Sequence, residues 1–441
     1  MLYFNNKPYK LAILNTAKEP LTPPQSDRNY LYFQAEEDGA TVSLVLNGSN
    51  WNPNQFQYST DGENWNTWTH SNGVLSTIGL THRGDYVFVR VSDDYGALST
   101  TSSKYAQFVL GDSKVAAGGS VLSLVSNTVP DDKNLSSYGF YRLFYNCVSL
   151  TTPPLLPSTT VGTYCYKEMF YNCASLRTAP VLPATNLASK ISCYGYMFYG
   201  CTSLKTAPAL PATTLEQNCY EYMFCGCSSL ITAPLLQATT MKSACYRNMF
   251  EGCSSLTTAP ALQSETLESF CYDSMFKNCT SLTTVPSLPA TTLKTNCYNA
   301  MFQGCLQLET AQLSLPATTA ASSCYSYMFQ GCQRLLSAPA LSLTTLSSNC
   351  CQYMFDGCIS LTSAPDLLAT SVSYSSCYRY MFNNCISLSY IKVYATTWNT
   401  SSAGQWVKNV YPTGTFVKPS GTTIGSGESG IPSGWAVQPL Q

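Results

Sequence analysis

Charge and long apolar runs are scarce in this chain of 441 residues. Charged residues make up 11% of it, against about a quarter in typical soluble domains. Its 23 Lys and Arg nearly balance its 24 Asp and Glu, for a net charge of −1. A chain without a basic excess is not expected to bind nucleic acid. No run of about eighteen apolar residues occurs, so no membrane span is predicted.

Histidine is also rare, which narrows the chemistry. The only two, His70 and His82, lie outside the cysteine-rich region, and this disfavours imidazole catalysis and mixed Cys/His metal sites. No Ser/His/Asp set, Walker loop or dinucleotide-binding loop occurs. We therefore assign no catalytic, cofactor-binding or metal residue, and predict a non-enzymatic protein without a cofactor. The N-terminus carries no secretory signal pattern, and we expect Met1 to begin the primary translation product.

Cysteine, in contrast, is abundant, and all 21 cysteines lie in an internal repeat. From Gly139 onward the motif C-Y-x-x-M-F-x-x-C-x-S-L-x-x-A-P-x-L-P-A-T-T-L recurs ten times. The second cysteine of each copy follows the previous one by 26 to 28 residues, at Cys147, Cys173, Cys201, Cys227, Cys253, Cys279, Cys305, Cys332, Cys358 and Cys385. A nearly constant period of this length predicts a solenoid.

Each copy divides into two halves. The first half places apolar residues at i, i+1, i+4, i+5 and i+8, as in Cys165, Tyr166, Met169, Phe170 and Cys173. This spacing predicts a short convex helix with one buried face, and irregular convex turns are the alternative. The second half predicts a strand of two to four residues, because proline recurs there and cannot donate to a β-ladder. We expect its proline face to point outward at Pro154, Pro180, Pro208, Pro234, Pro260, Pro286, Pro339 and Pro365.

Stacking these halves predicts a curved array. Adjacent strands lie ~4.8 Å apart, whereas packed helices need ~8–10 Å, so the strand side would be concave and roughly 43 Å long. No copy can bury its own apolar residues, so the copies depend on their neighbours. The residues expected in this shared core include Met169, Phe170, Cys173, Phe198, Cys201, Phe250, Cys253, Phe276 and Cys279.

The run Phe170-x-x-Cys173-x-Ser175-Leu176, followed by a short strand, resembles the BspA-like leucine-rich repeats of bacterial surface proteins. The C-terminal stretch from Gly414 to Trp435 is similar to the tail that closes such arrays. The resemblance covers roughly residues 104–441, although each copy is about three residues longer than the family pattern and carries an A-P dipeptide in its strand. The resemblance implies a binding or adhesion surface, in a family that also occurs in phage genomes.

The cysteines have four interpretations: a ladder of free thiols, a disulfide framework, a metal cluster or a redox site. Residues eight apart on a helix are separated by ~12 Å, too far for a disulfide. Spacings typical of zinc sites are approached only at Cys225 and Cys227 and at the adjacent pair Cys350 and Cys351. We therefore favour free thiols acting as small buried hydrophobic groups, which agrees with folding in the cytosol.

The predicted fold class is a repeat solenoid of the leucine-rich-repeat type, with short parallel strands and short convex helices. An N-terminal all-β, sandwich-like domain precedes it. Strand-like runs at Tyr30 to Phe33, Thr41 to Leu46, Phe56 to Ser59, Val74 to Ile78 and Tyr86 to Val91 predict the sandwich, with a hairpin turn at Asp61-Gly62. We divide the chain into a strand (Tyr9 to Leu14) with a Pro-rich linker as an attachment piece (1–28), the sandwich (29–113), an N-terminal cap (114–138), ten repeats (139–393) and a C-terminal cap (394–441).

Two groups of residues are candidate binding sites. The first group is a threonine column on the presumed concave face, together with the few charged residues beside it. Its members are Arg177, Thr178, Lys205, Thr206, Thr232, Thr258, Thr284, Glu309 and Thr310. This column reads either as solvated strand surface or as a hydrogen-bonding face for a glycan or protein. The second group consists of three tryptophans, which are either packing residues or a sugar-stacking platform: Trp51, Trp65 and Trp68.

Three functions follow as hypotheses. The first is a phage virion component (fibre, decoration or host-attachment protein) that is assembled in the host cytoplasm. Its N-terminal part would bind other virion proteins, and its solenoid would bind a host surface glycan or protein. The second is an extracellular adhesin on a bacterial cell surface, and the third is an intracellular scaffold. Homo-oligomers are compatible with all three.

Overall fold

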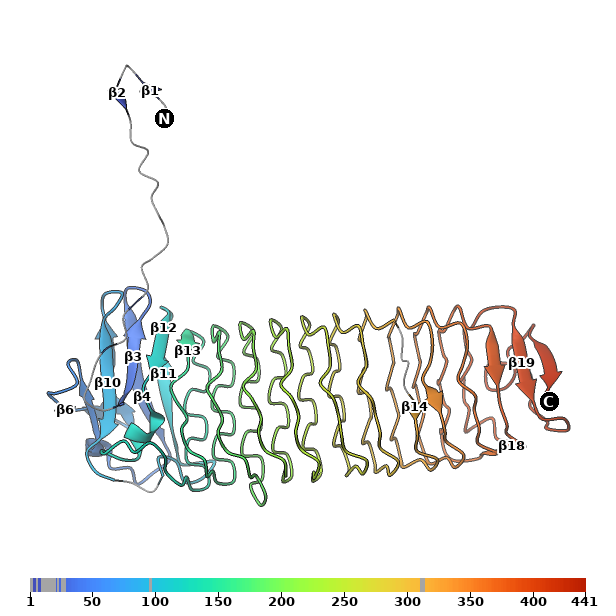
Figure 1. The fold of residues 1–441 in the computed structure, drawn as a ribbon, viewed down its shortest axis with the longest axis horizontal. Coiled ribbons are helices and arrows are strands. Elements are labelled where there is room, and N and C mark those ends of the chain that lie inside the picture. The colour runs from blue at the N-terminus through green and yellow to red at the C-terminus, as the bar shows by residue number, and fades with distance from the viewer. Residues whose placement is uncertain are drawn as a thin grey trace.

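The computed structural model describes residues 29–94, 97–309 and 314–441, together with residues 3, 4, 7, 8, 21 and 24. A β-rich N-terminal region leads into a long stack of coils (Figure 1). The predicted strand from Tyr9 to Leu14 and most of the attachment piece lie outside the described residues. Within that piece, β1 (Tyr3–Phe4) and β2 (Lys7–Pro8) pair in antiparallel fashion.

The N-terminal region is a sandwich of two sheets. The six-stranded sheet has the order β13-β12-β3-β10-β5-β6, and the other has the order β11-β4-β8-β7, with β9 also paired to β4. Phe33 and Phe108 come from different sheets, and their ring centroids lie 4.7 Å apart in the shared core. Four predicted runs correspond to single strands: β3 (Leu31–Ala35), β4 (Ala40–Asn47), β5 (Phe56–Ser59) and β10 (Tyr86–Val91). The run predicted from Val74 to Ile78 is divided into β8 (Val74–Leu75) and β9 (Ile78–Leu80). The sequence pattern does not predict β6 (Asn66–Thr67), β7 (His70–Ser71) or β11 (Tyr105–Leu110). Two 3₁₀ turns accompany them, η1 (Pro53–Gln55) and η2 (Val121–Leu124).

The hairpin turn is present and is held by one carboxylate. Asp61 lies between the paired strands β5 and β6, and its Oδ1 accepts the backbone N–H groups of Glu63 and Asn64 at 2.9 and 2.8 Å. Hydrogen bonds from Asn64, Glu63 and Ser59 hold the pKa of this carboxyl well below its usual range. The resulting local fold closes a β-hairpin.

The sandwich also begins the solenoid. Strand β12 (Val115–Gly118) pairs antiparallel with β3 and parallel with β13 (Leu150–Thr152), so one sheet runs from the sandwich into the first copy. Phe108 stacks on Phe144 of that copy at 5.3 Å, and the Cys147 thiol donates to the Phe108 carbonyl at 3.3 Å. The leading end of the array is therefore covered by a domain that continues its core.

The predicted convex helices are absent: the described residues contain no α-helix. The half of each copy that was predicted to be convex, which keeps the name convex half or convex side here, is instead a run of tight turns. Met169 N–H donates to Tyr166 C=O, and Tyr171 N–H to Glu168 C=O, both three residues back and both at 3.2 Å. The backbone φ angle is positive at every fourth residue, for example +57° at Tyr164, +57° at Glu168 and +58° at Asn172. Positive φ is incompatible with a right-handed helix, so this half of the repeat follows the turn alternative.

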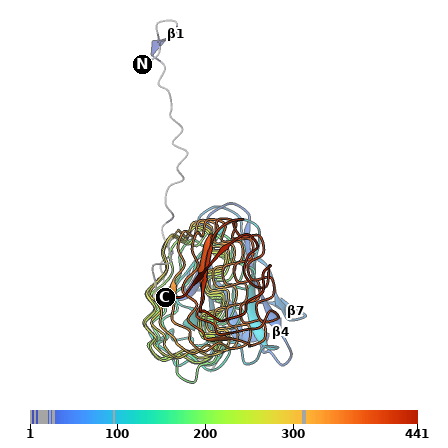
Figure 2. The same cartoon turned by 90° about the vertical axis from the view of Figure 1, so that its right-hand side faces the viewer.

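The amides between these turns bind the next coil. Glu168 N–H donates to Gly195 C=O and Phe170 N–H to Met197 C=O, each at 2.9 Å. The convex side therefore has a backbone ladder of its own, and neighbouring coils are as close there as strands are in a sheet. The predicted arc is wrong for this reason. The coils form a nearly straight stack whose outlines superimpose when viewed from the end (Figures 1 and 2).

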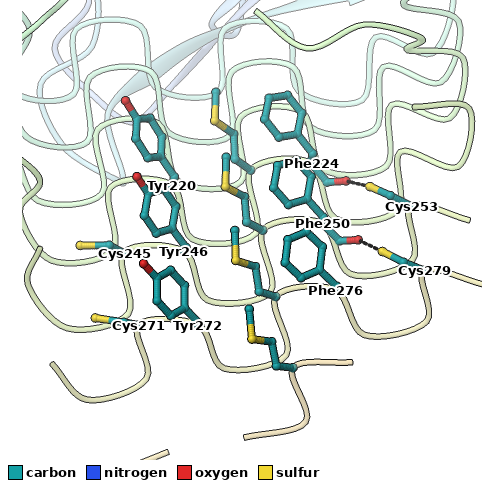
Figure 3. Close-up of a cluster of buried hydrophobic side chains, with 14 of the residues drawn as sticks. Tyr220, Phe224, Cys245, Tyr246, Phe250, Cys253, Cys271, Tyr272, Phe276 and Cys279 are labelled. Atoms are coloured by element: carbon teal, nitrogen blue, oxygen red, sulfur yellow. Dashed lines mark hydrogen bonds between the residues drawn. The ribbon is translucent and has the colours of Figure 1, made fainter. Parts of the chain in front are cut away.

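Close stacking brings identical side chains into columns. The rings of Phe224, Phe250 and Phe276 are parallel within 7° and 5.6 Å apart, and Tyr246 stacks on Tyr272 at 5.9 Å (Figure 3). All the predicted core residues are fully buried: Met169, Phe170, Cys173, Phe198, Cys201, Phe250, Cys253, Phe276 and Cys279. The prediction of a shared core between dependent copies is confirmed.

The strand half is thinner than predicted, because isolated bridges rather than strands of two to four residues join the middle copies, and its prolines point inward. Seven of the eight are buried and Pro260 is half-buried, so the expectation of an outward proline face is wrong. Bridges flank the proline, as in the parallel pairs Thr206↔Thr232 and Leu210↔Leu236 on either side of Pro208. Because proline has no N–H that needs a partner, it fits an inward position between two bridged ones.

The C-terminal end has a sheet of its own. The later strands are β14 (Ser314–Leu315), β15 (Ala340–Leu341), β16 (Ser371–Val372), β17 (Tyr390–Lys392), β18 (Thr397–Trp398), β19 (Thr415–Lys418) and β20 (Ala436–Pro439). Trp406 ends the phenylalanine column, with its ring 5.9 Å from that of Phe382. The last strand, β20, is exposed, and Pro439 removes an N–H from it, a known way to blunt a sheet edge.

All 21 cysteines are free and buried. In the second column each thiol donates to a phenylalanine carbonyl of the preceding coil, as Cys253 does to Phe224 and Cys279 to Phe250, both at 3.1 Å (Figure 3). The distance argument from helices does not hold, because coils stack closely and Cys193 contacts Cys219 through its side chain. Burial raises the pKa of the Cys165 thiol to about 12, and carbonyl acceptors also favour the protonated thiol. Cys350 is an exception, because the hydrogen bond with Cys351 lowers its pKa.

Thiol titration checks this arrangement. In native protein at pH 8 we expect almost no thiols to react with a disulfide reagent, because the burial that raises the thiol pKa also blocks access. In denaturant without reductant the count should approach 21. A denatured count near zero would contradict the free-thiol ladder and indicate disulfides.

Paired substitutions check the assignment of inside and outside. Replacing Phe250 by Ala removes a ring from the middle of a stacked column and should lower the free energy of unfolding by about 3–5 kcal/mol. Replacing the exposed Thr258 by Ala in the next half-coil should change it by no more than about 0.5 kcal/mol. Urea denaturation of both variants measures the difference, and equal losses would show that the core is assigned wrongly.

Candidate functional site

The outer surface of the strand half, here called the strand face, carries the predicted threonine column. Thr206, Thr232, Thr258 and Thr284 are exposed and joined in succession by parallel bridges. Thr178 is also exposed, whereas Thr310 lies outside the described residues. Backbone pairing therefore holds the hydroxyls of neighbouring coils in register, at about the spacing of strands in a sheet.

The charges predicted beside this column are largely neutralised. Arg177 forms an ion pair with Glu36 of the sandwich at 3.6 Å, and Glu309 pairs with Arg334 of the next coil. Lys205 is exposed, and its carbonyl accepts the Ile231 N–H. The strand face therefore has little net field with which to attract an ionic partner.

A second row runs parallel to the threonines. The residue after each inward proline is exposed, and in several coils it is a large apolar one: Leu155 is 50% exposed, Val181 75% and Leu235 59%. Turning the prolines inward has thus placed these side chains in solvent. Sequence reasoning missed this row because it assigned the prolines themselves to the surface.

The same face is hollowed near its middle. A depression of about 370 Å³ is lined by Val285, Pro286, Ser287, Leu288, Pro289, Ser314 and Pro316. The described part of its lining combines proline rings and aliphatic side chains with two serines. No sequence motif marked it, because it arises from residues of two neighbouring copies.

The three tryptophans do not form a sugar platform. Trp68 is fully buried and its indole N–H donates to Ser76 C=O at 2.7 Å, which corrects the platform reading. Trp65 is covered by the guanidinium of Arg90, 3.9 Å from its ring centroid. Trp51 is only partly buried, and its indole N–H donates to the backbone at 2.8 Å.

The convex turns present polar groups that mostly satisfy one another. Arg247 lies between Glu221 and Asp273, with N···O distances of 3.6 and 3.3 Å. Asn299 also donates to Asp273 at 2.9 Å. Burial raises the pKa of the Asp273 carboxyl despite these partners.

The described residues hold no group of three or more His, Cys, Asp or Glu side chains placed to bind a metal ion. Within the same ranges, no helix has the length and apolar character needed to cross a bilayer.

Comparison with known proteins agrees with this architecture. A search of curated proteins gave no match. A family model described as a BspA type leucine rich repeat region matches residues 166–309 and 244–388, with six copies. The two matches together span residues 166–388, just over half of the chain. The stacked coils, the shared apolar core and this match lead to one conclusion: the chain belongs to the BspA-type leucine-rich-repeat family.

Proposed function

We propose that the protein is a non-enzymatic binding protein whose strand face contacts a glycan or protein on a host cell. The observation that carries the proposal is the pairing of an in-register hydroxyl row with an apolar row on one weakly charged surface. Hydroxyls can both donate and accept hydrogen bonds, and exposed apolar side chains supply the area that is removed from water on binding. The depression lined by Pro286 and Pro316 gives this face a recess for a protruding group.

The chemistry of the face favours a neutral partner. Because Arg177 and Glu309 are already paired, electrostatic steering would contribute little to association. Affinity would come from shape, hydrogen bonds and repetition, since successive coils present threonine hydroxyls at the same position. Repeated weak contacts along a rigid stack give avidity without a strong single site.

We further propose that the protein is part of a phage virion, with its N-terminal part bound to other virion proteins and its solenoid directed outward. The support is the set of 21 buried free thiols, which suits a chain that folds in a reducing host cytoplasm. The alternative is a bacterial surface adhesin, which the family resemblance favours equally. An adhesin would use the same strand face on a different carrier.

One experiment on purified particles tests both parts. Deleting residues 1–28 should leave a folded, soluble protein that is missing from the particle, as measured by mass spectrometry of purified virions. Full-length protein carrying Thr232→Lys and Thr258→Lys should still be incorporated, but particle adsorption to host cells should fall about tenfold, because binding would bury unpaired charges.

The matched control is Gln217→Lys, which adds one charge at an exposed position between the strand face and the turns. It should change neither incorporation nor adsorption. Incorporation of the truncated chain, or its presence only on cells that export it, would contradict the virion proposal and favour the adhesin. Unchanged adsorption of the double-lysine particles would contradict the role of the strand face.

A further inference from the structure

The far end of the solenoid carries a loop that the strand face does not explain. Residues 425–430, Gly-Ser-Gly-Glu-Ser-Gly, precede the last strand, β20, at the end of the chain that lies opposite the sandwich (Figure 1). The loop folds back on itself: Gly427 N–H donates to Ile431 C=O at 2.7 Å, and Ile431 N–H to Gly425 C=O at 2.8 Å. A glycine-rich segment of this kind would be mobile in isolation, yet here its backbone is fixed.

Tryptophans fix the loop. Trp398 donates its indole N–H to Ser429 C=O at 3.1 Å, and Trp406 to Gly430 C=O at 2.8 Å. A third indole, of Trp435, donates to Tyr411 C=O at 2.8 Å. Three rigid donors thus hold the loop and the Tyr411 segment as two fixed walls. A site built in this way loses little conformational entropy on binding.

A pocket of about 170 Å³ lies between these walls. It is lined by Val407, Asn409, Val410, Tyr411, Pro412, Gly427, Glu428, Pro432 and Ser433. Tyr411 is 49% exposed although its backbone is bound on both sides, with its N–H donating to Leu388 C=O at 3.2 Å. A large ring left in solvent on an anchored backbone is a preformed stacking surface.

Polar groups converge beside this ring. Glu428 accepts one hydrogen bond, from Gln405 Nε2 to its Oε2 at 3.1 Å, and its carboxylate remains exposed. Asn409 donates its Nδ2 to Asn384 at 2.9 Å, which fixes the amide and leaves its carbonyl oxygen as an acceptor. Ser433 adds an exposed hydroxyl on the opposite wall.

We propose that this tip pocket binds a single neutral sugar residue, such as the terminal hexose of a surface glycan. The Tyr411 ring would stack on the apolar face of the sugar ring, and Glu428, Asn409 and Ser433 would bond its hydroxyls. The volume suits one ring rather than a chain. The site is separate from the strand face, so either can fail without the other.

The charge of the lining selects among small ligands. Among the described residues, Glu428 is the only charged one that lines the pocket, and its carboxylate would repel sialic and uronic acids. An ammonium ligand would gain from Glu428, but cages for ammonium ions use several aromatic rings, and within the described part of the chain Tyr411 is the only aromatic residue in the lining. A neutral pyranose uses one ring and several hydrogen-bonding groups, as found here.

The test is saturation-transfer NMR on the full-length protein with methyl galactoside, methyl glucoside, methyl mannoside, N-acetylglucosamine, glucosamine and sialic acid as probes. We expect transfer to at least one neutral sugar at about 1 mM affinity, and none to sialic acid. Tyr411→Ala should abolish the transfer, Tyr411→Phe should retain it because the ring remains, and Glu428→Gln should weaken it severalfold.

Tyr374→Ala is the matched control, since Tyr374 is 46% exposed but lies outside the pocket. Transfer should persist in this variant, and thermal unfolding should show that all variants are folded. The proposal is overturned if no neutral sugar shows transfer, if Tyr411→Ala leaves the transfer unchanged, or if only glucosamine binds. The last result would reassign the pocket to ammonium ligands.

Discussion

The structure depends on one constraint: on both sides of the described coils, backbone hydrogen bonds join each coil to its neighbours, from amide to the next coil on the convex side and, at positions such as Ile231, to the preceding coil on the strand side. On the convex side alternate residues such as Glu168 and Phe170 make these bonds, while the residues between them close tight turns within their own coil. Coil spacing is therefore set by β-type hydrogen bonding everywhere, which leaves no room for helices and gives no curvature. Stacked rings, thiols bonded to carbonyls and in-register threonines all follow from that spacing.

Much of this fold was readable from the sequence. The 26- to 28-residue period, the Cys/Met/Phe core, the thin strands and the sandwich all came from spacing and composition. The helix prediction was wrong, because apolar residues at i, i+4 and i+8 fit successive four-residue turns as well as helical turns. The available signal was Asn or Gly at the position before the second cysteine, as in Asn172 and Gly226, where φ is +58° and +75°.

The candidate site was predictable only in part. Its threonine column was found because threonine recurs at the same position in seven of the ten copies, and its exposure is confirmed at Thr178, Thr206, Thr232, Thr258 and Thr284. The apolar row and the depression depend on which way the prolines turn, and that was decided by bridges between coils rather than by any residue's own preference. The tip pocket depends on indole bonds between segments distant in sequence, which no local pattern encodes. The candidate binding surfaces are therefore created by the stacking of coils.

Far-UV circular dichroism of the purified protein tests the central claim most directly. If turns on the convex side bind the next coil, the spectrum should show β and turn contributions and lack the helical minimum at about 222 nm. A spectrum with the signal of ten short helices, one for each copy, would contradict the account. In that case the coils would stand further apart on the convex side, and the array would curve.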